Sequence, residues 1–237
     1  MIVQRGFSLI ELAMVLLIIS LVLGGLLVPL ATQLEARQRD EAQQQLERIR
    51  EALIGFAIVN GRLPCYTTQA DPANVNYGVE DAVCNPGGLA TDGILPWKTL
   101  GLNSGLDPWG VLRTTAGDQW LGYWRYRVHS DFSSMTPFTL TSDPTPPDNG
   151  LCVQDAGGNL LVSVSETPVA IVYSTGADRT ASGQNASYEQ TSVSADCVAN
   201  TPILYQGGPV SGNFDDITMW LTRPLLFNRM VTVGRLP

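Results

Sequence analysis

A single carboxylate stands at the start of the most apolar stretch of the chain. Glu11 precedes residues 12–31, in which Ser20 is the only polar side chain. A bare carboxylate in such a membrane-like segment costs about 2 to 3 kcal/mol. A free α-amine would supply the counter-charge, and cleavage between Gly6 and Phe7 would create one. Because residues 7 and 11 lie one turn apart on the same helix, we expect this amine to come mainly from a neighbouring copy of the chain.

Four cysteines follow the apolar stretch: Cys65, Cys84, Cys152 and Cys197. An even set of cysteines is typical of disulfides when the segment lies outside the cytosol. Four cysteines permit three connectivities. We favour Cys65 with Cys84 and Cys152 with Cys197, because each pair then brackets one loop rich in Gly, Pro and Asn. Zinc is the alternative, but the chain has no CxxC spacing and only one histidine.

No residue pattern in the sequence indicates an enzyme. The chain has no GxSxG elbow, no HExxH motif and no phosphate-binding glycine loop. Asp215 and Asp216 are adjacent, and adjacent strand residues point to opposite faces, which argues against an acid–base pair. The only histidine, His129, has no neighbour in sequence that forms a recognisable catalytic relay with it. We therefore expect a protein without enzymatic activity.

Composition argues against nucleic acid as a partner. The 237 residues carry a net charge of −8, and charged residues make up 15% of the chain. No Lys/Arg cluster follows the first helical segment. Removal of an N-terminal leader and the apolar stretch leaves about 200 residues, which is enough for one folded domain.

The apolar stretch is long enough to cross a membrane. As a helix, residues 12–31 would span about 30 Å, the thickness of a hydrocarbon core. Arg5 precedes the stretch, so the positive-inside rule places the N-terminus in the cytoplasm and the remainder on the other side. A secretory signal has a shorter apolar region and no acid. A plain single-pass anchor is the other alternative, and neither explains Glu11.

A second helical segment is predicted at residues 32–60. It holds no proline, and its apolar residues recur at steps of three and four, with charged side chains on the other face. Gly61 and Pro64 predict its end. The expected helix therefore has an apolar half, 7–31, and an amphipathic half, 32–60. The second half would pack on the folded domain or form a short coiled-coil stalk.

The remaining residues, 61–237, predict one α+β domain with large loops. An aromatic strand is expected at 120–129, with Trp124 on its core face and His129 on a solvent face that also carries Tyr123, Arg125 and Arg127. Further elements are expected as strands at 160–165, 169–174, 203–205 and 217–222, and as a terminal helix at 224–231. Short spacing favours antiparallel pairing, so we expect the long N-terminal helix to lie across an antiparallel sheet.

The sequence GFSLIEL at residues 6–12 resembles the leader junction of type IV pilins and type II secretion pseudopilins. The resemblance implies a pilin-like fold, cleavage by prepilin peptidase after Gly6 and N-methylation of Phe7. It also implies storage in the inner membrane and assembly with other pilin or pseudopilin subunits into an extracytoplasmic filament. The leader would then be 1–6, and the domain 61–237 would be a periplasmic head. The large head favours a minor or tip subunit.

Two further segments, DPWG at 107–110 and YSTGAD at 173–178, are similar to stretches of major pseudopilins. In that family a loop near the second segment binds calcium through acidic side chains and backbone carbonyls. The candidate ligands here are Asp178, Glu189, Asp215 and Asp216. Few acids follow Asp178, whereas calcium takes six to eight oxygens, so this chain departs from the pattern. We expect no obligatory cofactor, with calcium as the alternative.

A function of a different class is a membrane-tethered periplasmic binding module. Exposed Trp97, Trp109 or Trp120 could form a carbohydrate platform, although tryptophans are more often core residues. A mature chain that begins with methylated Phe7 would favour the filament subunit, and an intact Met1 would favour the tether.

Overall fold

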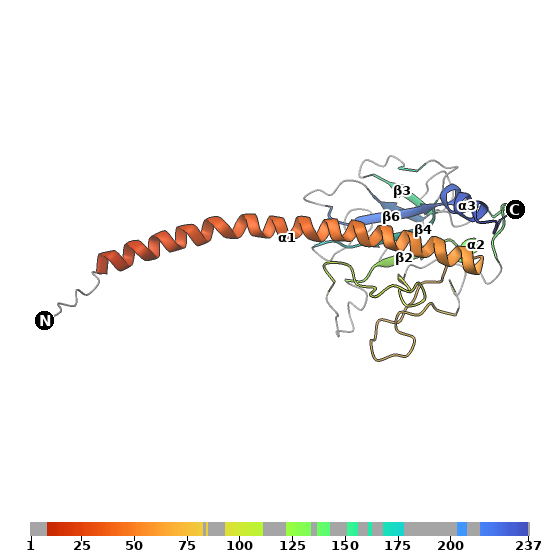
Figure 1. Ribbon diagram of the computed structural model, residues 1–237, viewed down its shortest axis with the longest axis horizontal. Coiled ribbons are helices and arrows are strands. Elements are labelled where there is room, and N and C mark those ends of the chain that lie inside the picture. The colour runs from red at the N-terminus through yellow and green to blue at the C-terminus, as the bar shows by residue number, and fades with distance from the viewer. Residues whose placement is uncertain are drawn as a thin grey trace. The chain divides into compact units, whose positions relative to one another are not determined.

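The computed structural model describes residues 9–82, 84, 93–110, 122–133, 137–142, 151–155, 161–162, 168–177, 203–207 and 214–236. Within these elements, the side chains at 22–31, 152, 154 and 203–206 are outside the description. The chain divides into two compact units, Met1–Glu41 and Ala42–Pro237. Helix α1, Leu9–Asn60, begins in the first unit and ends in the second (Figure 1). The two units are described in turn.

In the first unit, α1 exposes apolar side chains on every face. Over residues 9–21 the exposed fraction of the large apolar side chains runs from 47% at Ile19 to 90% at Leu9. Within the described part of the chain, no helix contains a stretch long and apolar enough to span a membrane. The span expected from sequence includes residues 22–31, whose side chains are outside the description.

In the second unit, the rest of α1 buries one apolar stripe. The buried positions recur at steps of three and four, which places them on one face of the helix, and are Ala42, Leu46, Ile49, Leu53 and Ala57. They share a core with residues of the sheet, so this half of α1 packs on the domain. The helix ends where Gly61 takes a positive φ of 69° and donates a backbone hydrogen bond to Ala57.

A four-stranded antiparallel sheet forms the centre of the second unit, with the order β1-β2-β4-β6. Its strands are β1 Gly93–Ile94, β2 Arg125–Val128, β4 Pro168–Ser174 and β6 Ile217–Thr222. The second half of α1 lies across this sheet (Figure 1). Tyr126 pairs with Val172, which pairs with Met219, and all three enter the core with the helix. The expected α+β arrangement is confirmed.

The second face of the sheet is buried, and the prediction that it faces solvent is wrong. Arg125, Arg127 and His129 are 4%, 1% and 1% exposed. A two-stranded sheet of β3 Leu151–Gln154 and β5 Ile203–Gln206 lies near this face, since β3 contacts β4. These two strands pair in parallel, contrary to the expected antiparallel pairing. The alternation of side chains along β2 distinguishes the two faces of the strand. It cannot show whether a segment distant in sequence covers the polar face.

Two short helices complete the described fold: α2 Ser130–Ser133 and α3 Arg223–Thr232. Helix α3 agrees with the expected terminal helix and has proline in its first turn. The expected strand at 160–165 is wrong where it is described, because residues 161–162 form a bend. Strands β1 and β3 were not expected, since each is short and lies in a loop-rich stretch.

Candidate functional site

The residues expected from sequence to form a processing junction and an assembly site lie near the N-terminus. Gly6 and Phe7 are outside the described residues. Glu11 lies in the first turn of α1, where a negative charge interacts favourably with the helix dipole. It is exposed, and it is the only charged residue among the exposed apolar side chains of 9–21. The structure therefore places one charged side chain among the exposed apolar side chains of this helical surface.

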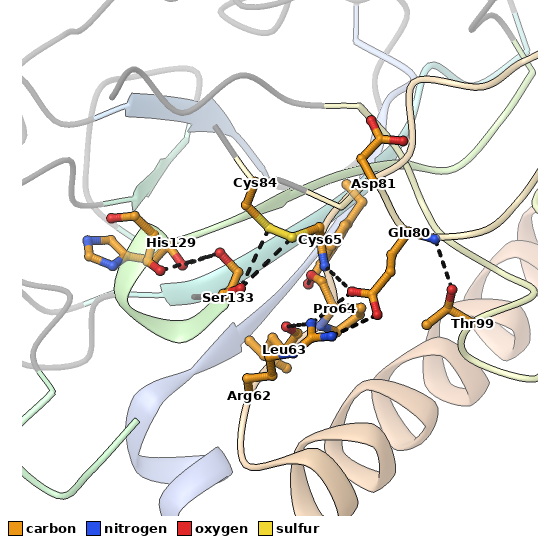
Figure 2. Close-up of a disulfide and its surroundings, with 12 residues drawn as sticks. Arg62, Leu63, Pro64, Cys65, Glu80, Asp81, Cys84, Thr99, His129 and Ser133 are labelled. Atoms are coloured by element: carbon orange, nitrogen blue, oxygen red, sulfur yellow. Dashed lines mark hydrogen bonds and ion pairs between the residues drawn. A yellow bond between two sulfur atoms is a disulfide. The ribbon is translucent and has the colours of Figure 1, made fainter. Parts of the chain in front are cut away.

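In the head, a disulfide joins Cys65 to Cys84, with a Cα–Cα distance of 5.2 Å. This is the pairing favoured from sequence. The two sulfurs lie 3.9 and 3.7 Å from the carbonyl oxygen of Ser133 in α2 (Figure 2). Disulfide sulfurs carry no hydrogen, so these are packing contacts. The side chain of Cys152 and all of Cys197 are outside the described residues, and their pairing stays a prediction.

A bidentate ion pair also cross-links the disulfide-closed segment, the stretch of chain that the Cys65–Cys84 disulfide brackets. Arg62 donates from Nη1 and Nη2 to the two carboxylate oxygens of Glu80, each at 2.8 Å. Glu80 Oε2 also accepts the backbone N–H of Cys65 at 2.9 Å, and the Glu80 N–H donates to Thr99 Oγ1 at 2.9 Å. The hydrogen bond to Glu80 raises the pKa of Arg62. Figure 2 shows this ion pair beside the disulfide, so two cross-links hold residues 62–84.

Tyr126 of β2 fixes the beginning of this segment to the sheet. Its hydroxyl donates to the carbonyl oxygen of Pro64 at 3.1 Å, and the residue is fully buried. Burial raises the pKa of Tyr126 well above its usual value, and the nearby charge of Glu80 acts in the same direction.

An aromatic cluster fixes the middle of the segment. The hydroxyls of Tyr77 and Tyr123 are 2.7 Å apart, and the Trp97 ring stacks on Tyr123 with 5.7 Å between centroids. Burial and the Tyr77 hydrogen bond raise the pKa of Tyr123. A Cβ at Gly78 or Gly105 would lie 2.4 or 2.1 Å from the Trp97 ring, so only glycine allows these backbones to approach the indole so closely.

Trp97 and Trp109, the two described tryptophans of the three candidates, do not form the carbohydrate platform considered from sequence. Trp97 and Trp109 are 4% and 7% exposed, and Trp120 lies outside the described residues. Both described rings pack in the interior, which is the usual place for this side chain.

A cleft of about 570 Å³ lies between the disulfide-closed segment and α2. Gln69, Asn76 and Asp81 line it from the segment, Ser130 lines it from α2, and the disulfide and the Arg62–Glu80 pair complete the walls. Sequence reasoning missed this site. The cysteine spacing predicted the closed loop, but no sequence signal places that loop against residues 130–133.

The segments at 107–110 and 173–177 meet in the interior. Ser174 donates from its hydroxyl to Asp107 Oδ2, and Asp107 Oδ1 accepts the backbone N–H of Trp109 at 3.0 Å. The N–H of Gly176 donates to Ser174 Oγ at 3.1 Å. A Cβ at Gly176 would lie 2.5 Å from the carbonyl oxygen of Asp215, so the turn requires glycine. The arrangement ties the turn at 107–110 to the end of β4.

The described residues do not by themselves fit a calcium site. Asp178 and Glu189 are outside the description. Asp215 lies against Gly176, and Asp216 is 1% exposed. Over the described ranges, no group of three or more His, Cys, Asp or Glu residues is placed to hold a metal ion, whereas calcium takes six to eight oxygens.

His129 has a structural environment. Its Nδ1 accepts the backbone N–H of Asp131 at 3.2 Å, at the start of α2, and its ring meets Phe132 edge to face. The hydroxyl of Ser133 donates to the His129 carbonyl oxygen at 3.2 Å. These contacts position α2 against the disulfide.

Comparison with known sequences bears on the N-terminal site. Residues 1–27 match the sequence family described as the prokaryotic N-terminal methylation motif. This motif is typical of type IV pilin and pseudopilin precursors, which prepilin peptidase processes. The matched range contains Gly6, Phe7 and Glu11. No curated protein and no solved structure matches the chain.

Proposed function

We propose that this chain is a structural subunit, a minor pilin or pseudopilin, of a type IV pilus or type II secretion filament. Prepilin peptidase would cleave it after Gly6, and Phe7 would be methylated. The observation that carries the proposal is the coincidence of the methylation motif at 1–27 with a helix that exposes apolar side chains on every face from 9 to 21.

A helix that is apolar all round does not remain in water. Exposed apolar surface of this extent marks a site that lipid or other helices cover. Among the described side chains of α1, residues 9–21 are exposed, and the buried apolar stripe lies between Ala42 and Ala57. The apolar half is therefore suited to hold the subunit in the inner membrane, with the head in the periplasm, and to pack against other subunits in the filament.

Glu11 would set the axial register of that packing. A carboxylate among apolar side chains interacts strongly with a nearby cation, because the surrounding dielectric constant is low. The new α-amine of Phe7 in a neighbouring subunit is a cation at the matching depth. Their pairing would favour one stagger of the helices over others.

The head would present surface to partners without performing catalysis. His129 is buried and engaged in hydrogen bonds at the start of α2, which supports a non-enzymatic role. The segments at 107–110 and 173–178 support a pseudopilin over a pilin, and the cross-linked loops of the head support a minor or tip position.

Chemical cross-linking in intact cells tests this function. The proposal predicts a ladder of cross-linked species that contain the mature chain, and its loss in a strain without prepilin peptidase. A chain that stays monomeric in the membrane, with or without the peptidase, would contradict the proposal.

A further inference from the structure

We propose that the cleft beside the Cys65–Cys84 disulfide binds a neutral polyhydroxylated ligand, a carbohydrate or the end of a glycan. This inference rests on the head alone and does not depend on filament assembly. The cleft lies between the disulfide-closed segment and α2, and Figure 2 shows two of its lining elements, Ser133 and the disulfide.

The cleft has room for a small ligand. Its volume of about 570 Å³ lies within the range of roughly 300 to 1,000 Å³ that is usual for small-molecule sites. Its walls combine apolar surface with polar groups. The disulfide and Ala82 are apolar members of the lining, and amide, hydroxyl and charged side chains supply its polar groups.

Covalent and hydrogen-bonded cross-links hold the walls of the cleft. The disulfide, the bidentate Arg62–Glu80 pair and the bond from Tyr126 to Pro64 hold one wall. In the other wall, the single hydroxyl hydrogen of Ser133 is shared between the carbonyl oxygens of His129 and Ser130. A site that is already ordered loses little conformational entropy on binding, which favours recognition by hydrogen bonds.

The charges of the cleft disfavour an anionic ligand. The guanidinium of Arg62 is engaged by Glu80 and by the carbonyl oxygen of Leu63. Two carboxylates, those of Glu80 and Asp81, line the same cleft and would repel a second negative charge.

The remaining groups match a polyol. Asp81 uses one oxygen, Oδ2, for both hydrogen bonds from Thr68, so its other oxygen keeps acceptor capacity. The amides of Gln69 and Asn76 each offer two donors and one acceptor, and the Ser130 hydroxyl offers one donor and acceptor capacity. Vicinal hydroxyls of a sugar donate and accept in alternation, which such a mixed set can satisfy.

Ligand-observed saturation-transfer NMR on the full mature chain tests the proposal. The detergent should be lauryldimethylamine oxide, which carries no sugar, and the probes glucose, galactose, N-acetylglucosamine, maltose and lactose. We expect saturable transfer to at least one sugar and none to succinate. In Gln69→Leu and in Asn76→Leu, affinity should fall about tenfold, because each loses hydrogen bonds to the ligand.

The matched control is Gln44→Leu, which makes the same change at an exposed position of α1 outside the cleft. It should bind like the wild type. Three outcomes would overturn the proposal: no sugar shows saturable transfer, binding persists unchanged in both cleft variants, or triglycine alone shows transfer that the cleft variants lose. The last outcome would assign the cleft to peptides.

Discussion

Ser174 donates a hydrogen bond to the buried carboxylate of Asp107, 67 residues away in sequence. Asp107 opens a tight turn through its bond with the N–H of Trp109, and Ser174 ends strand β4. One side-chain contact therefore connects a loop of the head to its central sheet.

Removal of this contact should destabilise the head. Ser174→Ala leaves a buried carboxylate with one donor fewer, so we expect a loss of about 1 to 3 kcal/mol in the free energy of unfolding, measured by urea denaturation. Ser104→Ala is the matched control, because Ser104 is exposed and accepts only a local bond from Leu106. Equal losses in the two variants would show that the buried hydrogen bond contributes no more to the free energy of unfolding than a local surface hydrogen bond.

The disulfide should stabilise the head by restricting its unfolded state. Cys65 and Cys84 are 19 residues apart, and closure of a loop of this size contributes about 3 kcal/mol in the chain-entropy estimate. The double variant Cys65→Ala/Cys84→Ala should lose about that amount in chemical denaturation. A midpoint that does not move, under conditions that keep the wild-type disulfide oxidised, would contradict this assignment.

Stability should fall at alkaline pH because of Tyr126. Burial raises the pKa of Tyr126 in the folded state well above 10.0, the usual value of a tyrosine. The unfolded chain therefore releases this proton first as pH rises, so the contribution is complete below about pH 10 and declines above it. The decline approaches about 1.4 kcal/mol per pH unit for one proton.

Tyr126→Phe provides the check by denaturation from pH 8 to 11. This variant should lose about 1 kcal/mol at pH 8, since the bond to Pro64 is absent, and should show a shallower alkaline decline. Part of the decline should remain, because the pKa of Tyr123 is raised as well. If the free energy of unfolding of Tyr126→Phe declined with pH as steeply as that of the wild type, ionisation of Tyr126 would not cause the alkaline loss of stability.

Glu11 should matter for assembly and not for processing. Glu11→Ala should be cleaved and should remain in the membrane, whereas its amount in the cross-linked filament fraction should fall at least about tenfold, because loss of an ion pair in apolar surroundings costs more than about 1.4 kcal/mol. Glu11→Asp keeps the charge and should retain part of the assembly. Normal incorporation of Glu11→Ala would refute the register role.

Local patterns in the sequence predicted much of the fold. The stripe that includes Leu46 and Leu53 predicted which side of α1 is buried, Gly61 predicted its end, and the aromatic run predicted β2. The loop bracketed by Cys65 and Cys84 was also correct. Each of these features depends on neighbours within a few turns or on a single cross-link, which a sequence displays directly.

Tertiary contacts between distant segments were not predictable in the same way. The sequence pattern predicted that Arg127 faces solvent, whereas the residue is buried. The alternation of side chains along β2 carries no information on whether another layer covers the polar face. The cleft could not be predicted from the sequence for the same reason, because Gln69 and Ser130 come together only through the packing of α2 on the disulfide. Burial of Trp97 depends on two glycines, Gly78 and Gly105, on opposite sides in sequence.

The mass of the mature N-terminus tests the central claim most directly. Peptide mass spectrometry of the chain purified from its native membrane should show a first residue of Phe7 that carries one methyl group, and Gly6→Leu should accumulate the uncleaved precursor because a side chain crowds the scissile junction. A native chain that retains Met1 and residues 2–6, or full maturation of Gly6→Leu, would contradict the account.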